Sequence, residues 1–172
     1  MYPIGPYSPP EKLNLKSVKS LAEDLVKFPE ELKSVILNFS QNQFQTKTLP
    51  GVWTVAQVIH HLADSHMNAF IRTKLALTEE VPVIKPYLEE KWAELADGKN
   101  SSVIESIKIL EGVHQRWYTL IISLDETYIR KEYFHPENNK KVQVADVVPL
   151  YVWHGRHHLG HIELLKNEKG WA

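Results

Sequence analysis

Apolar residues recur every three or four positions over four long stretches of the chain, the spacing of helices that bury one face. The first stretch has this spacing at Leu15, Val18, Leu21, Leu25 and Phe28. Pro29 interrupts it, but two glutamates follow, and a proline with acids in the first turn is typical of a helix start. We therefore expect a first helix over about residues 14–40, with a kink or break near 28–29.

The second stretch has a clear start signal. Thr54-Val-Ala-Gln57 is a candidate capping box, in which the Thr hydroxyl accepts an orphan backbone N–H and the Gln side chain reaches back to the Thr N–H. The pattern predicts a second helix over about residues 55–78. Its apolar stripe comprises Val55, Val58, Ile59, Leu62, Ala63, His66 and Phe70.

The other two helices are predicted in the same way. Ser102-Val-Ile-Glu105 is a second candidate capping box, and the third helix should follow it to about Leu124. The last helix is expected over about residues 145–167, with Gly170 marking its end. Inward-facing positions on the third helix are Ile104, Ile107, Leu110, His114, Trp117, Leu120 and Ile121. Those on the last helix are Val147, Leu150, Tyr151, His154, His158, Ile162 and Leu165.

The connecting segments carry weaker signals. Four prolines within residues 1–12 favour an extended N-terminal arm on the surface. A short helix is expected around Leu88–Leu95, and residues 125–142 predict a short irregular hairpin before the last helix. Four helices of this length predict an all-α four-helix bundle in a single domain over residues 1–172. The long connections leave the order of the helices around the bundle open.

Composition narrows the class of protein. The chain has 172 residues, a net charge of −1 and no cysteine, so it has no disulfide and no thiolate metal site. The charge balance disfavours nucleic-acid binding, which usually needs a basic excess. The longest apolar run, Val147–Trp153, is too short to cross a membrane, and the N-terminus lacks the features of a signal peptide. These features predict a cytoplasmic protein without a membrane or nucleic-acid partner.

Histidines are the informative residues, and four of the nine fall in one HxxHHxxH cluster. The cluster contains two i,i+4 pairs, His154/His158 and His157/His161, and either pair could share one ion on a helix face. A third ligand from a facing helix would complete an open three-His site. His61 is the candidate, because it belongs to the polar stripe of the second helix at Gln57, His61, Asp64, Ser65, Asn68 and Arg72.

Less specific interpretations apply to the other histidines. The polar stripe of the second helix could also be a face in contact with solvent. His60 and His135 are expected to be ordinary surface or hydrogen-bonded residues. His66 and His114 fall on apolar stripes and are expected to be core or hydrogen-bonding residues rather than ligands.

Two motifs together resemble a known family. Residues 53–66, Trp-Thr-Val-Ala-Gln-Val-Ile-His-His-Leu-Ala-Asp-Ser-His, and residues 151–162, Tyr-Val-Trp-His-Gly-Arg-His-His-Leu-Gly-His-Ile, are similar to the DinB/YfiT-like superfamily, and within it to the YfiT-type metal-dependent hydrolases. The resemblance implies a four-helix bundle, a homodimer and one divalent ion held by His61, His154 and His158, with zinc first and nickel next. His157 and His161 then become outer residues, and His161 stands where many members have Gln.

The resemblance implies hydrolysis of a small-molecule substrate by a water that the ion activates. Asp64 and His157 are the candidates for orienting a ligand or transferring a proton. The first alternative is a metal-dependent thiol S-transferase that uses a bacillithiol-type thiol; a pocket containing Arg72, Arg116 or Arg156 would favour it. The second alternative is a non-catalytic, dimeric helical bundle.

Overall fold

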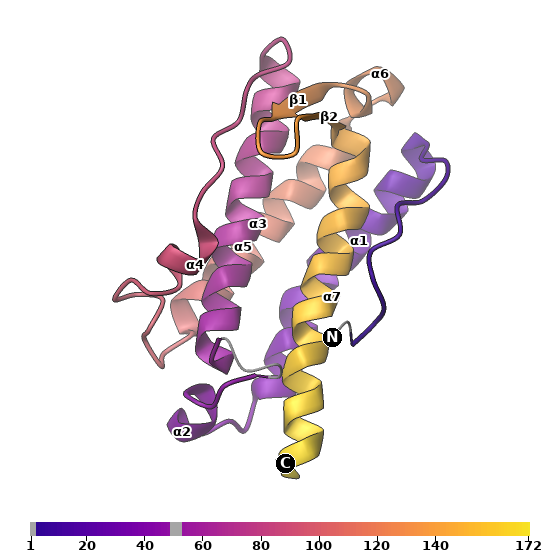
Figure 1. Cartoon of the computed structure of the whole chain (residues 1–172). Helices are drawn as coiled ribbons and strands as arrows, with labels where there is room; N and C mark the ends of the chain where they lie inside the picture. Colours follow the sequence, from indigo (N-terminus) through magenta and orange to yellow (C-terminus); the bar gives the residue numbers. More distant parts are fainter. Residues whose placement is uncertain (1–2, 49–52) are drawn as a thin grey trace.

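The computed structural model describes residues 3–48 and 53–172, and four long helices form its frame (Figure 1). They are α1 (Leu15–Ile36), α3 (Val55–Thr78), α5 (Ile104–Ser123) and α7 (Val144–Lys169). α1 and α3 each pack against both α5 and α7, so the order around the bundle is α1, α5, α3, α7. The predicted all-α four-helix bundle is confirmed, and the order that the sequence left open is now given.

Short elements fill the connections. They are α2 (Gln41–Phe44), α4 (Glu89–Trp92), α6 (Glu126–Ile129), β1 (Glu132–His135) and β2 (Lys140–Gln143). β1 and β2 form an antiparallel hairpin, as predicted. The backbone of Phe134 also pairs with the loop after α3, donating to Pro82 O at 2.9 Å and accepting from Ile84 N at 3.1 Å. The hairpin therefore holds the loop that crosses the bundle from α3 to α4.

The first helix differs from the expectation in two respects. α1 continues through Pro29 as one helix, with the proline ring buried, so of the predicted kink or break the break is absent. The helix ends at Ile36 and not near Ser40. Ser40 instead caps α2, since its hydroxyl accepts from Gln43 N at 3.4 Å and its own N–H donates to Gln43 Oε1 at 2.7 Å. A serine that can bond locally competes with helix continuation, which is the physical reason for the earlier end.

The two predicted capping boxes have different outcomes. The box at α3 is present: Gln57 N donates to Thr54 Oγ1 at 3.2 Å, and Thr54 N donates to Gln57 Oε1 at 3.0 Å. The box at Ser102 is not formed, because α5 begins at Ile104 after Val103 without a side-chain cap. Ser102 N instead donates to Asn100 Oδ1 at 3.0 Å. Ile104, predicted to face inward, is 57% exposed.

The apolar core is divided into two clusters by a layer of histidines. One cluster contains Leu25, Ala69, Trp117 and Val152, and the other contains Phe28, Ala63, Leu110 and Leu159. On α3, α5 and α7 the gap between the clusters falls at His66, His114 and His154, respectively. The polar layer therefore crosses the middle of the bundle.

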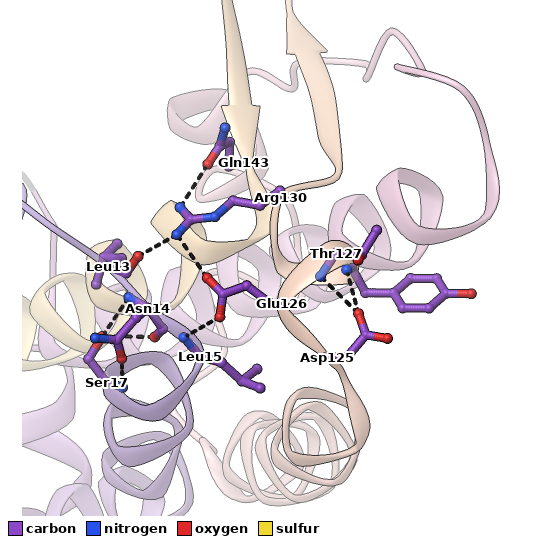
Figure 2. Close-up of polar contacts among 10 residues, drawn as sticks. Leu13, Asn14, Leu15, Ser17, Asp125, Glu126, Thr127, Arg130 and Gln143 are labelled. Atoms are coloured by element: carbon purple, nitrogen blue, oxygen red, sulfur yellow. Dashed lines mark hydrogen bonds and ion pairs between the residues drawn. The ribbon is translucent and has the colours of Figure 1, made fainter.

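Arg130 fastens the end of the bundle that carries the hairpin (Figure 2). Its guanidinium donates to Leu13 O at 2.6 Å, to Glu126 Oε1 at 3.1 Å and to Gln143 Oε1 at 3.3 Å. Glu126 in turn accepts from Leu15 N at 3.1 Å. One arginine thus links the start of α1, the short helix α6 and the end of β2.

The N-terminal arm lies against α7, and its first two positions are outside the described residues. Trp153 Nε1 donates to Gly5 O at 3.2 Å, and the Trp153 ring packs against Tyr7 with centroids 5.6 Å apart. Gly160 allows the arm to approach closely, because a Cβ there would lie 3.1 Å from the Pro3 side chain. The predicted arm is therefore a fixed part of the surface of α7.

Candidate metal centre

Three histidines from two facing helices meet at the histidine layer. His61 lies on α3, and His154 and His158 lie one turn apart on α7. One nitrogen of each ring lies within 4.8 Å of the others, and His61 Nε2 is 3.3 Å from His154 Nε2. The structure therefore brings together the three residues that the resemblance implied as ligands; their binding of an ion stays a prediction.

The spacing and chemistry of these nitrogens fit a transition metal. Two nitrogens bound at about 2.0–2.1 Å in tetrahedral geometry are separated by about 3.3–3.4 Å, close to the 3.3 Å between His61 Nε2 and His154 Nε2. Burial lowers the pKa of His61 to about 4. Burial, together with neighbouring imidazoles, lowers the pKa of His158 to about 2 and holds that of His154 well below the usual range. The rings are thus neutral at pH 7, the form in which imidazole binds a metal.

A chain of buried hydrogen bonds fixes the tautomer of His154. His114 Nδ1 donates to Leu25 O at 2.5 Å, because a carbonyl oxygen can only accept. His114 Nε2 then accepts from His66 Nδ1 at 2.7 Å, and His66 Nε2 accepts from His154 Nδ1 at 3.2 Å. Burial lowers the pKa of His114 to about 4 and holds that of His66 well below the usual range, so both are neutral. The lone pair of His154 is therefore on Nε2, the atom that faces His61.

The polar stripe on α3 is largely buried, so its interpretation as a solvent-facing surface is wrong. Gln57, His61, Ser65 and Arg72 are all buried, whereas Asp64 and Asn68 are half-buried. The stripe faces the loop between α3 and α5, since Gln57 Nε2 donates to Ala93 O at 2.9 Å. A long connection that folds back over a helix cannot be recognised from the periodicity of the helix alone.

Sequence reasoning missed Glu89. One of its carboxylate oxygens lies 4.0 Å from His61 Nδ1, on the side of the ring opposite the nitrogen that faces His154. Burial raises the pKa of the Glu89 carboxyl. A carboxylate at this place orients a ligating histidine in many metal sites. Glu89 begins the four-residue helix α4, where no spacing pattern distinguishes it from the neighbouring Glu90.

The two residues that the sequence suggested for proton transfer are not members of the three-histidine cluster. The carboxyl of Asp64 is half-buried; burial and Asp97 raise its pKa, and His60 lowers it. His157 stacks on Trp153, and its Nε2 lies 3.3 Å from His161 Nε2. Its ring centroid is 5.3 Å from that of His158. His157 and His161 thus form a second pair beside the three-histidine cluster, and the roles of Asp64 and His157 stay predictions.

The remaining histidines behave as expected, except for His135. His60 is held by Ser106 Oγ at 2.7 Å and by Asn100 O at 2.9 Å, so it is a hydrogen-bonded structural residue. His66 and His114 are fully buried in the hydrogen-bond chain. His135 was expected to be an ordinary residue, but it lines the pocket beside the cluster.

That pocket has a volume of about 400 Å³ and is lined by Ser65, Arg72, Tyr87, Glu89, His135 and Tyr151, among others. It adjoins the cluster, because the Tyr151 ring lies 5.5 Å from that of His154, centroid to centroid. Of the three arginines that were candidates for a pocket, only Arg72 lines this one. Arg116 is exposed over the Phe70 ring, and Arg156 is exposed and paired with Asp24 at 3.0 Å.

Comparison with known proteins gives the family. The DinB superfamily profile matches residues 24–162, most of the chain. The chain belongs to the DinB superfamily. It is 39% identical over 171 residues to "Putative metal-dependent hydrolase YfiT" of Bacillus subtilis, covering 99% of this chain and 96% of that protein. It is 43% identical over 170 residues to a "Putative metal-dependent hydrolase" of Bacillus cereus (strain 03BB102), covering 99% and 97%.

Two solved structures share the fold. Bacillus subtilis YfiT, described as a probable metal-dependent hydrolase with an unusual four-helix bundle topology, has a TM-score of 0.95 at 39% identity, covering 99% of this chain and 98% of that one. The mycothiol-dependent maleylpyruvate isomerase has a TM-score of 0.68 at 16% identity, covering 87% and 61%, and shares the fold alone. No helix among the described residues is long and apolar enough to span a membrane.

Proposed function

We propose that this DinB-superfamily protein is a metal-dependent hydrolase of small molecules. The observation that carries the proposal is the meeting of three neutral imidazoles from α3 and α7, one buried and two partly buried, beside a polar pocket. Three protein ligands leave at least one position open for water or substrate, as in catalytic zinc sites. The names of the YfiT-type relatives, which are 39% and 43% identical over nearly the whole chain, point to the same class of reaction.

His61, His154 and His158 would hold the ion. The ion, when bound, supplies a Lewis acid and a water of lowered pKa. Glu89 would orient His61 through Nδ1, and the hydrogen-bond chain from Leu25 O would keep His154 Nε2 free for coordination. Zinc is the first choice for an all-imidazole set, and nickel is the next.

The first experiment measures metal content by elemental mass spectrometry after dialysis against a mild chelator. Wild type is expected to retain about one ion per chain, and His154→Ala is expected to lose it. His135→Ala is the matched control, because it removes an imidazole close to the site but outside the three-histidine cluster. Equal retention in all three proteins would show that the cluster does not hold the ion.

The second experiment measures turnover on a panel of amide and ester substrates. Hydrolysis is expected in the metal-loaded wild type and is expected to fall to the uncatalysed rate in His61→Ala. A protein that holds the ion but hydrolyses none of the panel would leave the three-histidine site in place and count against the hydrolase.

The presence of Arg72 in the pocket keeps thiol S-transfer as a second candidate, since low-molecular-weight thiols such as bacillithiol carry carboxylates. Both reactions would use the same three histidines. The same wild-type protein should therefore be assayed for conjugation of a thiol to an electrophile. Conjugation without hydrolysis would replace the first proposal. The absence of both activities would favour the non-catalytic bundle.

A further inference from the structure

Arg72 is a buried cation without a carboxylate partner. Its side chain lies on α3 and is 9% exposed, yet among the described residues no carboxylate lies within 4.0 Å of it. Its contacts include a hydrogen bond from Nη2 to Lys85 O at 3.4 Å, the face of Tyr87, 6.0 Å from the guanidinium carbon, and the hydroxyl of Tyr151. Burial of a charge is unfavourable unless an opposite charge accompanies it. This arginine is therefore suited to receive an anion.

Other donors surround the pocket at Arg72. The hydroxyls of Tyr87 and Tyr151 stay protonated at neutral pH, because burial raises the pKa of both. Ser65 lies close enough to both hydroxyls to act on their pKa values, and Arg72 acts on that of Tyr151. One guanidinium and three hydroxyls can therefore supply hydrogen bonds to the oxygen atoms of one bound group.

The pocket connects Arg72 with the three-histidine cluster. Ser65 lies one turn after His61 on α3, and Tyr151 lies one turn before His154 on α7. Arg72 is eleven residues after His61, which corresponds to about 16 Å along the helix axis. Helical side chains lean toward the N-terminus, and the Arg72 guanidinium reaches the hydroxyl of Tyr151, one turn from His154. A ligand held at Arg72 would thus have its other end near the ion.

The charges at the rim favour a monoanion. Glu89, Glu90 and Glu137 line the pocket with only Lys91 to offset them, and the side chains of all four are exposed. These acids would repel a doubly charged phosphate more strongly than a single carboxylate. The planar fork of a guanidinium also matches a carboxylate in shape.

We propose that Arg72 binds a carboxylate of the substrate at the end of the pocket remote from the three-histidine cluster. The inference deepens the proposed function and rests on it only for the reaction at the other end of the substrate. It narrows the substrate class to small carboxylic acids whose scissile bond lies several bonds from the carboxylate. A purely structural arginine that ties α3 to Lys85 would show no such preference.

The test compares two probes that differ in one group. Hippurate carries a carboxylate and an amide bond, and hippuramide replaces the carboxylate with a neutral amide. Calorimetry on the metal-loaded wild type is expected to show hippurate binding at least about ten-fold more tightly, which corresponds to about 1.4 kcal/mol. Equal binding of the two probes would overturn the proposal.

The variants assign the preference to Arg72. In Arg72→Met the preference for hippurate is expected to disappear while the metal content stays at the wild-type level. Arg116→Met, which removes an exposed arginine outside the pocket, should keep the preference. If Arg72→Met does not fold, Arg72→Lys is used instead. Its ratio of hippurate to hippuramide affinity should be several-fold lower than that of the wild type, because an ammonium cannot form the two-pronged contact. An unchanged preference in the variant used would overturn the assignment.

A last comparison separates Arg72 from the ion, which can also bind a carboxylate. His154→Ala, which lacks the ion, is expected to keep the preference for hippurate. If the preference is lost in His154→Ala and kept in Arg72→Met, the carboxylate binds the ion and the proposal is wrong. Because every readout is binding, a failure to hydrolyse any substrate would count against the proposed function and leave this test intact.

Discussion

Two histidines that the sequence places in the core also determine the tautomer of His154, a candidate metal ligand. His66 and His114 are fully buried, as the apolar stripes predict, but their hydrogen bonds run in one direction, from His154 to the carbonyl of Leu25. The sequence could not show this, because the partners lie on four different helices and the contacts span 48 to 89 positions. The sequence could not indicate Glu89 either, because its contact with His61 also joins two separate elements.

We expect His114→Phe to weaken metal binding by about 10–100-fold, the range for outer residues that orient a ligand. The variant keeps an aromatic ring but removes the acceptor of His66, so His154 can exchange between its two tautomers. Chelator competition measures the affinity, and ¹⁵N chemical shifts of the metal-free protein report the tautomer.

The control for this test is His60→Phe, which removes a buried histidine bonded to Ser106 and Asn100 outside the chain. Its metal affinity should equal that of the wild type. A loss of the same size in both variants would indicate general destabilisation and would contradict the role of the chain.

At the scale of elements, periodicity predicted the four helices well and their starts less well. The box at Thr54 formed and the box at Ser102 did not, although both have a hydroxyl residue followed three positions later by Gln or Glu. The difference lies in what precedes each helix. Thr54 is fixed in extended backbone by pairing with Lys47, whereas Ser102 is drawn into a turn by Asn100. Such contacts with a neighbouring segment are not visible in a four-residue motif.

We expect Thr54→Ala to lower the free energy of unfolding by about 0.5–2 kcal/mol, because it leaves an N-terminal N–H of α3 without its acceptor. Ser102→Ala has the same sequence pattern and should change stability little. Urea denaturation of both variants measures the difference. Equal losses would contradict the cap assignment.

The contact between α1 and α7 is close at Gly155. A Cβ there would lie 3.0 Å from the Phe28 ring, which stacks on His66 with centroids 6.0 Å apart. Gly155→Ala should therefore displace Phe28 and cost about 1–3 kcal/mol of stability. Gly112→Ala, where a Cβ meets nothing within 4 Å, should stabilise α5 by about 0.4–1 kcal/mol. Denaturation of both variants tests the contrast, and stabilisation by Gly155→Ala would refute the close contact.

At the scale of the whole molecule, the histidine layer couples stability to pH. Five histidines, His61, His66, His114, His154 and His158, have a pKa lowered chiefly by burial. In the unfolded chain each would take up a proton near pH 6.5, whereas the folded chain takes it up only near pH 4 for His61 and His114 and near pH 2 for His158. Their contribution to stability is therefore complete above about pH 6.5 and is lost as the pH falls.

We expect the metal-free protein to lose stability steeply between pH 6.5 and pH 5.5. Each neutral histidine contributes a slope of up to about 1.4 kcal/mol per pH unit, so unfolding should take up about 4.5 protons at pH 5.5. Urea denaturation at several pH values gives the slope. Uptake of fewer than one proton would show that the layer is already charged or open to solvent.

The homodimer implied by the family resemblance also belongs to this scale and stays a prediction. Light scattering of the purified protein is expected to give twice the chain mass of 19.9 kDa. A single-chain mass across the concentration range would contradict it.

The packing of the N-terminal arm against α7 has a practical consequence for all of these metal measurements. Pro3 lies against Gly160, two residues beyond His158, and the N-terminal arm runs beside α7 (Figure 1). A polyhistidine purification tag fused ahead of the arm would therefore emerge beside the very helix under study and offer six competing imidazoles. If the same tag were fused after Ala172, beyond the far end of α7, the arm would keep its position, and the measured metal content would be that of the protein and not of the tag.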